Sequence, residues 1–266
     1  MENENVVVKF LKAYESYLSS SFKELWSRVK IEYNKLDAYS VIGGLLSRQV
    51  TLSLEMARSP NTLNGHSAPL FLRAMTDLHI TLSWMMMDLE ERTKLYILHG
   101  LGDTKLLIEH YKNQIDNNPD DTNEHIEKLI EVKSAWINSQ RNDFFVEVNL
   151  GHWAQLDTRK MSQESDCEDL YKFAYKTFSQ SAHNMWSHVS VYNCKPCASS
   201  LHKHHLIPEL FEAPLDLDYL YRSCKYVDKA YNLFINNFNL EPNFLLPLDW
   251  WDKFFQDRND LEKANK

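Results

Sequence analysis

The feature that most constrains the fold of this chain is its scarcity of residues that interrupt helices. Only six glycines occur in 266 residues, and the stretches 70–99, 152–195 and 215–241 contain neither glycine nor proline. Turn-rich β architectures need these residues, whereas long helices exclude them. The sequence therefore predicts an all-α protein, and a hydrophobic content of 44% can supply its core.

Apolar residues at helical spacing predict the individual helices. Successive steps of four and three residues mark stripes of the kind that helices bury against one another. We expect a bundle of about seven helices in one domain over residues 1–266, with a kink at Gly100 and Gly102. The expected helices lie near 5–33, 38–58, 71–87, 89–114, 122–145, 171–192, 220–238 and 247–266, and the most buried residues should include Phe71, Met75, Leu78, Leu82, Leu220, Val227 and Phe234.

Charge and composition limit the surroundings in which the protein acts. The net charge of −8 opposes a general electrostatic grip on DNA or an anionic membrane, although it leaves room for a small basic groove. No run of about 18 apolar residues is present to span a membrane. The start MENENVVVKF lacks the basic region of a signal peptide, and four cysteines suit a reducing compartment. We expect a cytoplasmic protein without membrane contact.

Several familiar chemistries have no sequence signature here. Walker, GxGxxG and GxSxG loops are absent, and so are the paired Glu-x-x-His motifs of di-iron helical bundles. These absences argue against enzymes with a nucleotide-binding fold, α/β-hydrolases and ferritin-like proteins. We expect no cofactor.

A short insert between two predicted helices is the best candidate for a metal site. It reads NCKPCASSLHKHHLIPEL, and thiolate and imidazole at such spacings can surround tetrahedral zinc. Against zinc, Pro196 sits between the cysteines and all ligands come from one short segment. The favoured interpretation is an exposed loop without metal, and the candidate zinc ligands are Cys194, Cys197, His202 and His205, with His204 beside them.

Ionisable residues inside two apolar helices form the candidate functional site. Arg73 and Asp77 lie four residues apart and can form an ion pair, whereas His79 is about 120° further round the helix. One interpretation is structural, with Arg73 and Asp77 satisfying each other. The other makes Arg73 an anion clamp and a histidine the general acid or base for phosphodiester cleavage without metal.

The second helix offers Ser179 and His183, again four residues apart. His183 can hydrogen-bond along its own face, which it shares with Ser179 and Trp186 rather than with the apolar stripe. A single helical histidine is more often structural, but this one could point into a cleft between helices. We expect helix packing to bring His183 to Arg73 and Asp77 in one polar cluster.

Two segments resemble a bacterial all-helical family known only as a domain of unknown function (DUF5677). They read APLFLRAMTDLHITLSWMMMDLEERTKLY at 68–96 and LYKFAYKTFSQSAHNMWSHVS at 170–190. Family members carry an arginine on an apolar helix, usually with an acid four residues on, and later a tyrosine-rich helix ending in a serine and histidine pair. The resemblance covers about 40–240, implies a helical fold and a bacterial source, and maps to Arg73, Asp77, Tyr175, Ser179 and His183, where Asp77 replaces the more usual glutamate.

A weaker likeness is to the HEPN nucleases, helical proteins whose signature is an arginine and a histidine a few residues apart. RAMTDLH, from Arg73 to His79, has this spacing, but it lies early in the chain rather than late. Such nucleases, and many proteins of the unknown-function family, belong to phage-defence or mobile loci. The likeness implies the same biology for this chain without fixing its chemistry.

Two classes of function follow from the sequence. The first is a metal-independent, HEPN-like ribonuclease or toxin acting on RNA, with Arg73 as clamp, His183 or His79 as acid and base, and Asp77 and Ser179 beside them. The second is a non-catalytic sensor or adaptor, possible as a homodimer, whose exposed aromatics bind a protein partner. Trp250 and Trp251 are the aromatics expected in that role.

Overall fold

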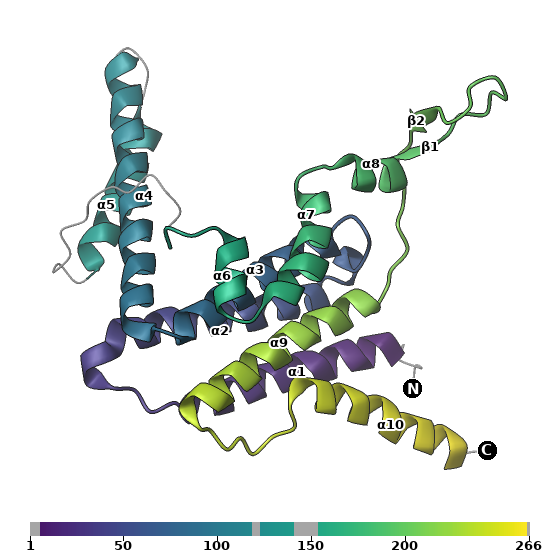
Figure 1. Cartoon of the computed structure of the whole chain (residues 1–266), viewed down its shortest axis with the longest axis horizontal. Coiled ribbons are helices and arrows are strands. Elements are labelled where there is room, and N and C mark those ends of the chain that lie inside the picture. The colour runs from purple at the N-terminus through teal and green to yellow at the C-terminus, as the bar shows by residue number, and fades with distance from the viewer. Residues whose placement is uncertain (1–5, 119–122, 141–153, 265–266) are drawn as a thin grey trace.

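The computed structural model describes residues 6–118, 123–140 and 154–264, without the side chains of 257–264, and it is almost entirely helical (Figure 1). The predicted all-α class is confirmed, but the described residues form ten α-helices rather than about seven. They are α1 (Val6–Ser27), α2 (Leu36–Arg58), α3 (Ala68–Met86), α4 (Leu89–Asn117), α5 (Glu124–Ser139), α6 (Thr158–Glu164), α7 (Lys176–Ala182), α8 (Trp186–Tyr192), α9 (Asp218–Phe238) and α10 (Pro247–Ala264).

Shorter elements complete the chain. They are the 3₁₀ turns η1 (Tyr33–Lys35) and η2 (Pro60–Thr62), the π-helix η3 (Leu170–Tyr175), and the strands β1 (Cys194–Pro196) and β2 (Leu206–Pro208). The strands form one antiparallel pair in which Lys195 faces Ile207. As predicted, the described residues contain no sheet of three strands. None of the described helices is long and apolar enough to cross a membrane.

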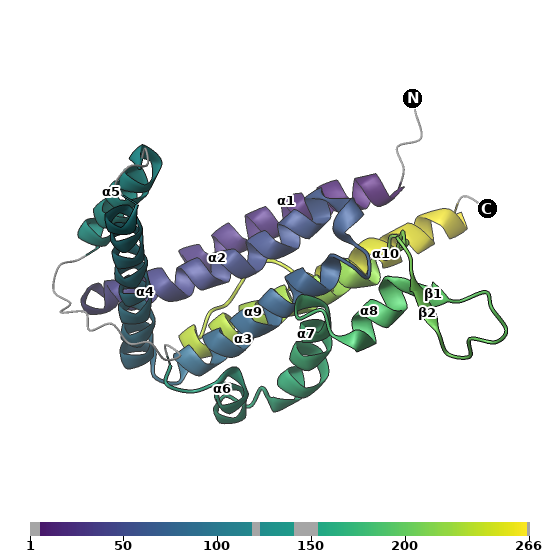
Figure 2. The same cartoon turned by 90° about the horizontal axis from the view of Figure 1, so that it is seen from above.

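The core lies where α1, α2, α3, α9 and α10 run alongside one another (Figures 1 and 2). Its apolar stripes are those expected, since six of the seven predicted core residues are buried, and Phe71 alone is only partly buried. Polar groups in this core bond to each other: the Tyr14 hydroxyl lies 2.8 Å from Ser53 Oγ, which lies 2.8 Å from Ser223 Oγ. Burial of such groups is tolerated because each has a partner.

The C-terminal aromatics belong to this core and not to a free surface. The Trp251 side chain is buried, its ring centroid 4.6 Å from that of Phe10. Trp250 stacks on Tyr17, with 4.6 Å between centroids. The expectation that Trp250 and Trp251 are exposed for partner binding is therefore wrong, because α10 lays them against α1.

Two parts of the chain project from the core on the same side (Figure 1). One is the hairpin of α4 and α5, and the other contains α8 and the two strands. The expected kink in α4 is absent: the helix continues through Gly100 and Gly102, and Gly102 is buried against its neighbours. Of the predicted helix over 122–145, the structure describes only α5, because residues 122 and 141–145 lie outside the described residues. Trp153, in the connection that follows, lies outside them as well.

The single helix expected over 171–192 is divided into three elements. The chain begins as the π-helix η3, continues as α7, and breaks after Ala182 before α8 starts at Trp186. Asn184 adopts the left-handed conformation with φ 52°, and Met185 N donates to Gln180 O at 2.9 Å. A left-handed asparagine with this hydrogen bond is a common helix C-terminus, so the apolar spacing continues across a real break.

Candidate functional site

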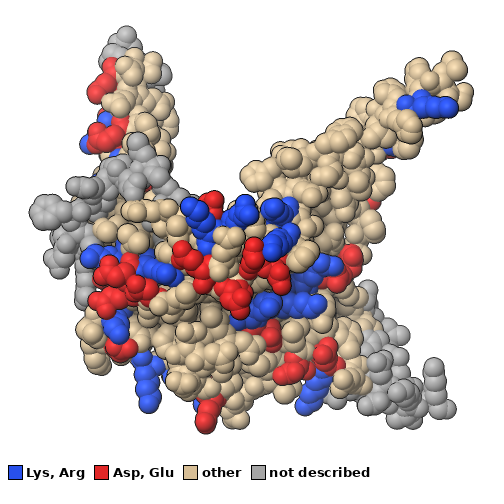
Figure 3. All heavy atoms as spheres, viewed as in Figure 1, with Lys and Arg blue, Asp and Glu red and all other residues tan. Residues whose placement is uncertain are grey.

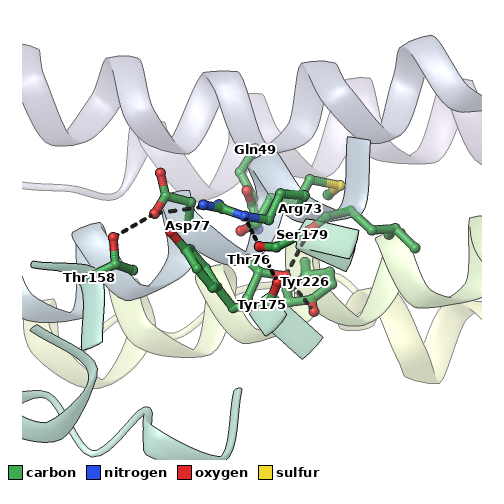
Figure 4. A network of polar contacts seen from close by, with 10 residues as sticks. Gln49, Arg73, Thr76, Asp77, Thr158, Tyr175, Ser179 and Tyr226 are labelled. Carbon is green, nitrogen blue, oxygen red and sulfur yellow. Dashed lines mark hydrogen bonds and ion pairs between the residues drawn. The ribbon is translucent and has the colours of Figure 1, made fainter. Parts of the chain in front are cut away.

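Arg73 is the centre of a polar cluster between α3, η3 and α7 (Figure 4). Its Nε donates to Ser179 Oγ at 2.7 Å, and its guanidinium carbon lies 3.3 Å from the ring centroid of Tyr175. One terminal nitrogen is 3.7 Å from Asp77 Oδ1, which confirms the predicted ion pair. We refer to Arg73, Asp77, Tyr175, Ser179 and Thr158 as the Arg73 cluster.

The elements around the cluster hold its members in place. The Ser179 hydroxyl donates to Tyr175 O at 2.6 Å, so its oxygen is free to accept from Arg73. Thr158, at the start of α6, donates to Asp77 Oδ1 at 3.3 Å. The Arg73 side chain is only 17% exposed. Stacking, charge and hydrogen bonds all direct Arg73 at other parts of the protein, as in a structural contact.

His79 faces the core and does not join the cluster. It is buried, its Nε2 lies 3.5 Å from Ser83 Oγ, and its Nδ1 has no partner among the described residues. Burial, together with the charge of Lys229, lowers the pKa of His79 to about 4. The ring is therefore neutral near pH 7, and its position follows from the 120° that separates it from Arg73 on the helix.

His183 also lies outside the Arg73 cluster, although the sequence predicted it as a member. It caps the C-terminus of α7 and is exposed. In the described part of the chain its backbone N donates to Ser179 O at 3.0 Å, and no side-chain bond joins it to Arg73 or Asp77. Ser179, which the sequence also predicted at the site, does contact Arg73, whereas His183 lies one turn further on, at the end of α7.

A second polar site lies beneath α8. A cavity of about 320 Å³ is lined by residues of α7, α8 and α9, among them His188, Tyr192 and Arg222. The His188 ring stacks on Tyr192, and burial together with nearby His66 lowers the pKa of His188. Gly65 is needed here, because a Cβ at this position would lie 2.1 Å from the Tyr192 ring. Arg73 does not line this cavity.

Three of the four candidate zinc ligands of the Cys/His insert lie close together. Cys197, His202 and His205 bring one ligand atom each to within 4.8 Å of one another. Cys194 lies on β1, opposite Pro208, and is not a member of this group. The four cysteines are free thiols, and burial raises the pKa of the Cys224 thiol to about 12, so this core cysteine is unreactive.

Sequence reasoning missed Thr158 and the cavity beneath α8. Thr158 gave no signal, because its contact with Asp77 depends on how α6 lies across α3. The lining of the cavity comes from residues far apart in the chain, including His188 on α8 and Arg222 on α9. A polar residue on an otherwise apolar helix is visible in sequence, but its partner on a third helix is not.

Residues 39–195 match the model of a family described as a family of unknown function (DUF5677). The match covers more than half of the chain and includes the whole Arg73 cluster, while α9 and α10 lie beyond it. No curated protein and no solved structure matches the chain. These comparisons give no support to the HEPN likeness.

Proposed function

The chain belongs to DUF5677, a family of unknown function, and we propose that it is a non-catalytic helical adaptor that binds a protein partner. The Arg73 cluster supports this proposal indirectly, because its groups have partners within the protein and neither predicted histidine stands beside Arg73. A general acid or base must lie within hydrogen-bond reach of the reacting group that an arginine clamps. The cluster is better suited to holding η3 and α7 against α3.

The observation that carries the proposal is the apolar surface of one projection. We call residues 185–215 the arm; it contains α8, β1, β2 and part of the connection to α9 (Figure 1). Large apolar side chains are exposed along it, and concentrated exposure of this kind marks an interaction surface. They are Met185, Trp186, Val191, Leu201, Leu210, Phe211 and Leu215.

The charge of the arm favours a protein over a nucleic acid. It contains two lysines and two glutamates, and Lys195 pairs with Glu209 at 2.6 Å. Figure 3 shows the arm as mostly uncharged, in contrast to the mixed acidic and basic band across the core. Binding to RNA relies on unpaired basic side chains. Trp186 is 65% exposed and is the side chain best suited to fill a partner's pocket.

A site-specific crosslink tests this assignment. A photoreactive phenylalanine analogue at position 186 should join the full-length protein to one other protein in producing cells. The same analogue at Trp136, a tryptophan that is 45% exposed on α5, is the matched control and should give little of that product. Mass spectrometry identifies the adduct. Crosslinks to RNA, or equal yields at both positions, would contradict an adaptor acting through the arm.

A metal-independent ribonuclease or toxin is the second candidate, and one observation favours it. His188 and Arg222 line the same cavity, which pairs a possible acid or base with a cation. Asp216 and Asp218 line it too, and Arg222 Nε donates to Asp218 at 2.5 Å, so an RNA phosphate would meet acidic neighbours. Incubation of labelled RNA with the purified protein and with a His188→Ala variant tests this second candidate. Cleavage by the parent protein that the variant does not show would favour the ribonuclease.

A bacterial source, a cytoplasmic location and a role in phage defence belong to the same proposal. If the arm recruits a defence partner, production of the protein in a bacterial host should reduce phage plating. Trp186→Ala should remove this protection, and Trp136→Ala should keep it. Equal protection by the parent and both variants would show that the arm has no role in defence.

A further inference from the structure

The tip of the arm gathers a thiol and two imidazoles at one point. Cys197 Sγ lies 3.6 Å from His202 Nδ1. One ligand atom from each of Cys197, His202 and His205 lies within 4.8 Å of the other two. The rings of His202 and His205 are nearly perpendicular, with 5.5 Å between centroids. We refer to these three residues as the tip triad.

The β-hairpin fixes this arrangement through its backbone. Beyond the paired strands, Cys197 N donates to His205 O at 2.9 Å, which continues the ladder and sets the two residues side by side. The chain reverses at His204, whose φ of 63° is left-handed, and His205 N donates to His202 O at 3.1 Å. Both histidines of the triad are thereby held on the same turn.

The separation of Cys197 and His202 agrees with that of a tetrahedral zinc site, and His205 brings its ligand atom to within 4.8 Å of both. With Zn–S near 2.3 Å and Zn–N near 2.05 Å, tetrahedral angles place sulfur and nitrogen about 3.6 Å apart. The Cys197 Sγ to His202 Nδ1 distance has this value. Ser199 N also donates to Cys197 Sγ at 3.5 Å, a contact that orients the sulfur within the turn.

A hydrogen bond between thiol and imidazole would explain the contact of Cys197 with His202 alone. The backbone bond from Cys197 N to His205 O sets those two residues side by side, but it does not choose the rotamer that brings a ring nitrogen of His205 to within 4.8 Å of the other two ligand atoms. Both imidazoles are on exposed residues, so burial does not drive them together. A shared ligand accounts for all three positions at once.

We propose that the tip triad binds one zinc ion through Cys197 Sγ and one nitrogen each of His202 and His205, with solvent in the fourth position. Borderline metals such as zinc prefer one thiolate and two imidazoles, whereas magnesium and calcium prefer oxygen. Cys194 is excluded as a ligand because side chains alternate along a strand, and a spacing of three residues places it on the face opposite Cys197.

Metal analysis of the reduced full-length protein tests the site. After equilibration with zinc and gel filtration, about one equivalent should remain, and cobalt(II) should give a thiolate charge-transfer band. Cys197→Ser should lose both signals, whereas Cys194→Ser should keep them. Cys167 and Cys224 are buried and supply no competing surface thiol.

A second pair of variants separates the histidines. His205→Asn should lose the metal, while His204→Asn should keep it, because asparagine tolerates the left-handed backbone at this position. Circular dichroism checks that each variant retains the helical signal of the parent. The proposal fails if the parent retains no stoichiometric zinc, or if Cys194→Ser or His204→Asn loses as much metal as its partner variant.

Discussion

In the Arg73 cluster a cation, a carboxylate and hydroxyl groups pair with one another, whereas the tip triad brings together three groups that can each bind a metal. Arg73 has a ring beneath it, a hydroxyl at its Nε and a carboxylate beside it. The triad places a thiol and two imidazoles together with no opposite charge between them. A polar cluster that satisfies itself stabilises the fold, and one that does not is suited to a ligand.

The two regions also differ in what surrounds them. Arg73 is 17% exposed and joins three elements of the helical body. The triad lies at the end of a two-stranded projection, away from the core (Figure 1). We therefore expect mutations in the Arg73 cluster to change the free energy of unfolding, and mutations at the triad to change metal binding alone.

Arg73→Ala should give the largest change. It removes a partly buried stacking contact and a charge-assisted hydrogen bond, which together are worth about 3 kcal/mol. Urea denaturation measures the loss. Arg58→Ala is the control, because Arg58 makes only exposed ion pairs with Glu15 and Glu55 and should cost less than about 1 kcal/mol. Equal stability of the two variants would show that the Arg73 cluster has no structural role.

His79 should make stability depend on pH. Its pKa is about 4 in the folded protein, against roughly 6.5 in an unfolded chain. The unfolded state therefore binds more protons between these values, so the contribution is complete above the higher pKa and is lost as pH falls toward the lower one. Between about pH 7 and pH 5 this should remove about 2 kcal/mol.

Urea denaturation at the two pH values measures this loss. His79→Leu should abolish the His79 component, and His110→Gln, at an exposed histidine, should leave it unchanged. If the pH dependence survived His79→Leu, the buried histidine would not be its source.

Ser179→Ala isolates one contact of the Arg73 cluster. The Ser179 hydroxyl bonds Tyr175 O four residues back and also accepts from Arg73 Nε. Ser40 makes only the first kind of bond, to Leu36 O, so Ser40→Ala is the matched control. Ser179→Ala should be less stable than this control by about 1 kcal/mol in urea. No difference would mean that Arg73 finds an equivalent acceptor.

Cys197→Ser should give the smallest change. In metal-free buffer its effect on the midpoint of thermal unfolding should correspond to less than about 0.5 kcal/mol, as for exposed substitutions away from a core. Differential scanning calorimetry of the variant and of the parent protein measures the two midpoints. A loss as large as that of Arg73→Ala would show that the arm and the core unfold as one unit, and that the triad contributes to the stability of the helical body.

The fold could be predicted where local and long-range signals agree. The stripe of α9 and the absence of breakers in α3 predicted helices that bury Met75 and Phe234. The division of 171–192 was hidden, because the apolar spacing persists while the left-handed Asn184 redirects the backbone. The face of Trp251 was hidden for another reason, since its partner Phe10 lies at the opposite end of the chain.

In the candidate sites, too, contacts within one segment could be predicted from the sequence, and contacts that depend on packing could not. Arg73 and Asp77 could be paired from their spacing on one helix, and the Cys/His insert could be identified from its residue types. The sequence predicted both Ser179 and His183 beside Arg73, and only the packing of α7 against α3 shows that Ser179 makes the contact. The exclusion of Cys194 depended on its lying in an extended strand that leads to Cys197, a conformation that the residue types alone do not encode.

The π-helix η3 makes this protein tolerant of the loss of one residue. A π-helix accommodates one residue more than an α-helix of the same rise, and η3 ends at Tyr175, one turn before Ser179 in the cluster. Deletion of Lys172 would let the segment relax to an α-helix of the same rise, so the chain before and after it would keep its present place. Tyr171 and Tyr175, whose ring centroids now lie 4.9 Å apart, would then be separated by three residues, a spacing at which two side chains still meet on a helix. Related chains that keep the arginine and serine should therefore include some with one residue fewer within η3.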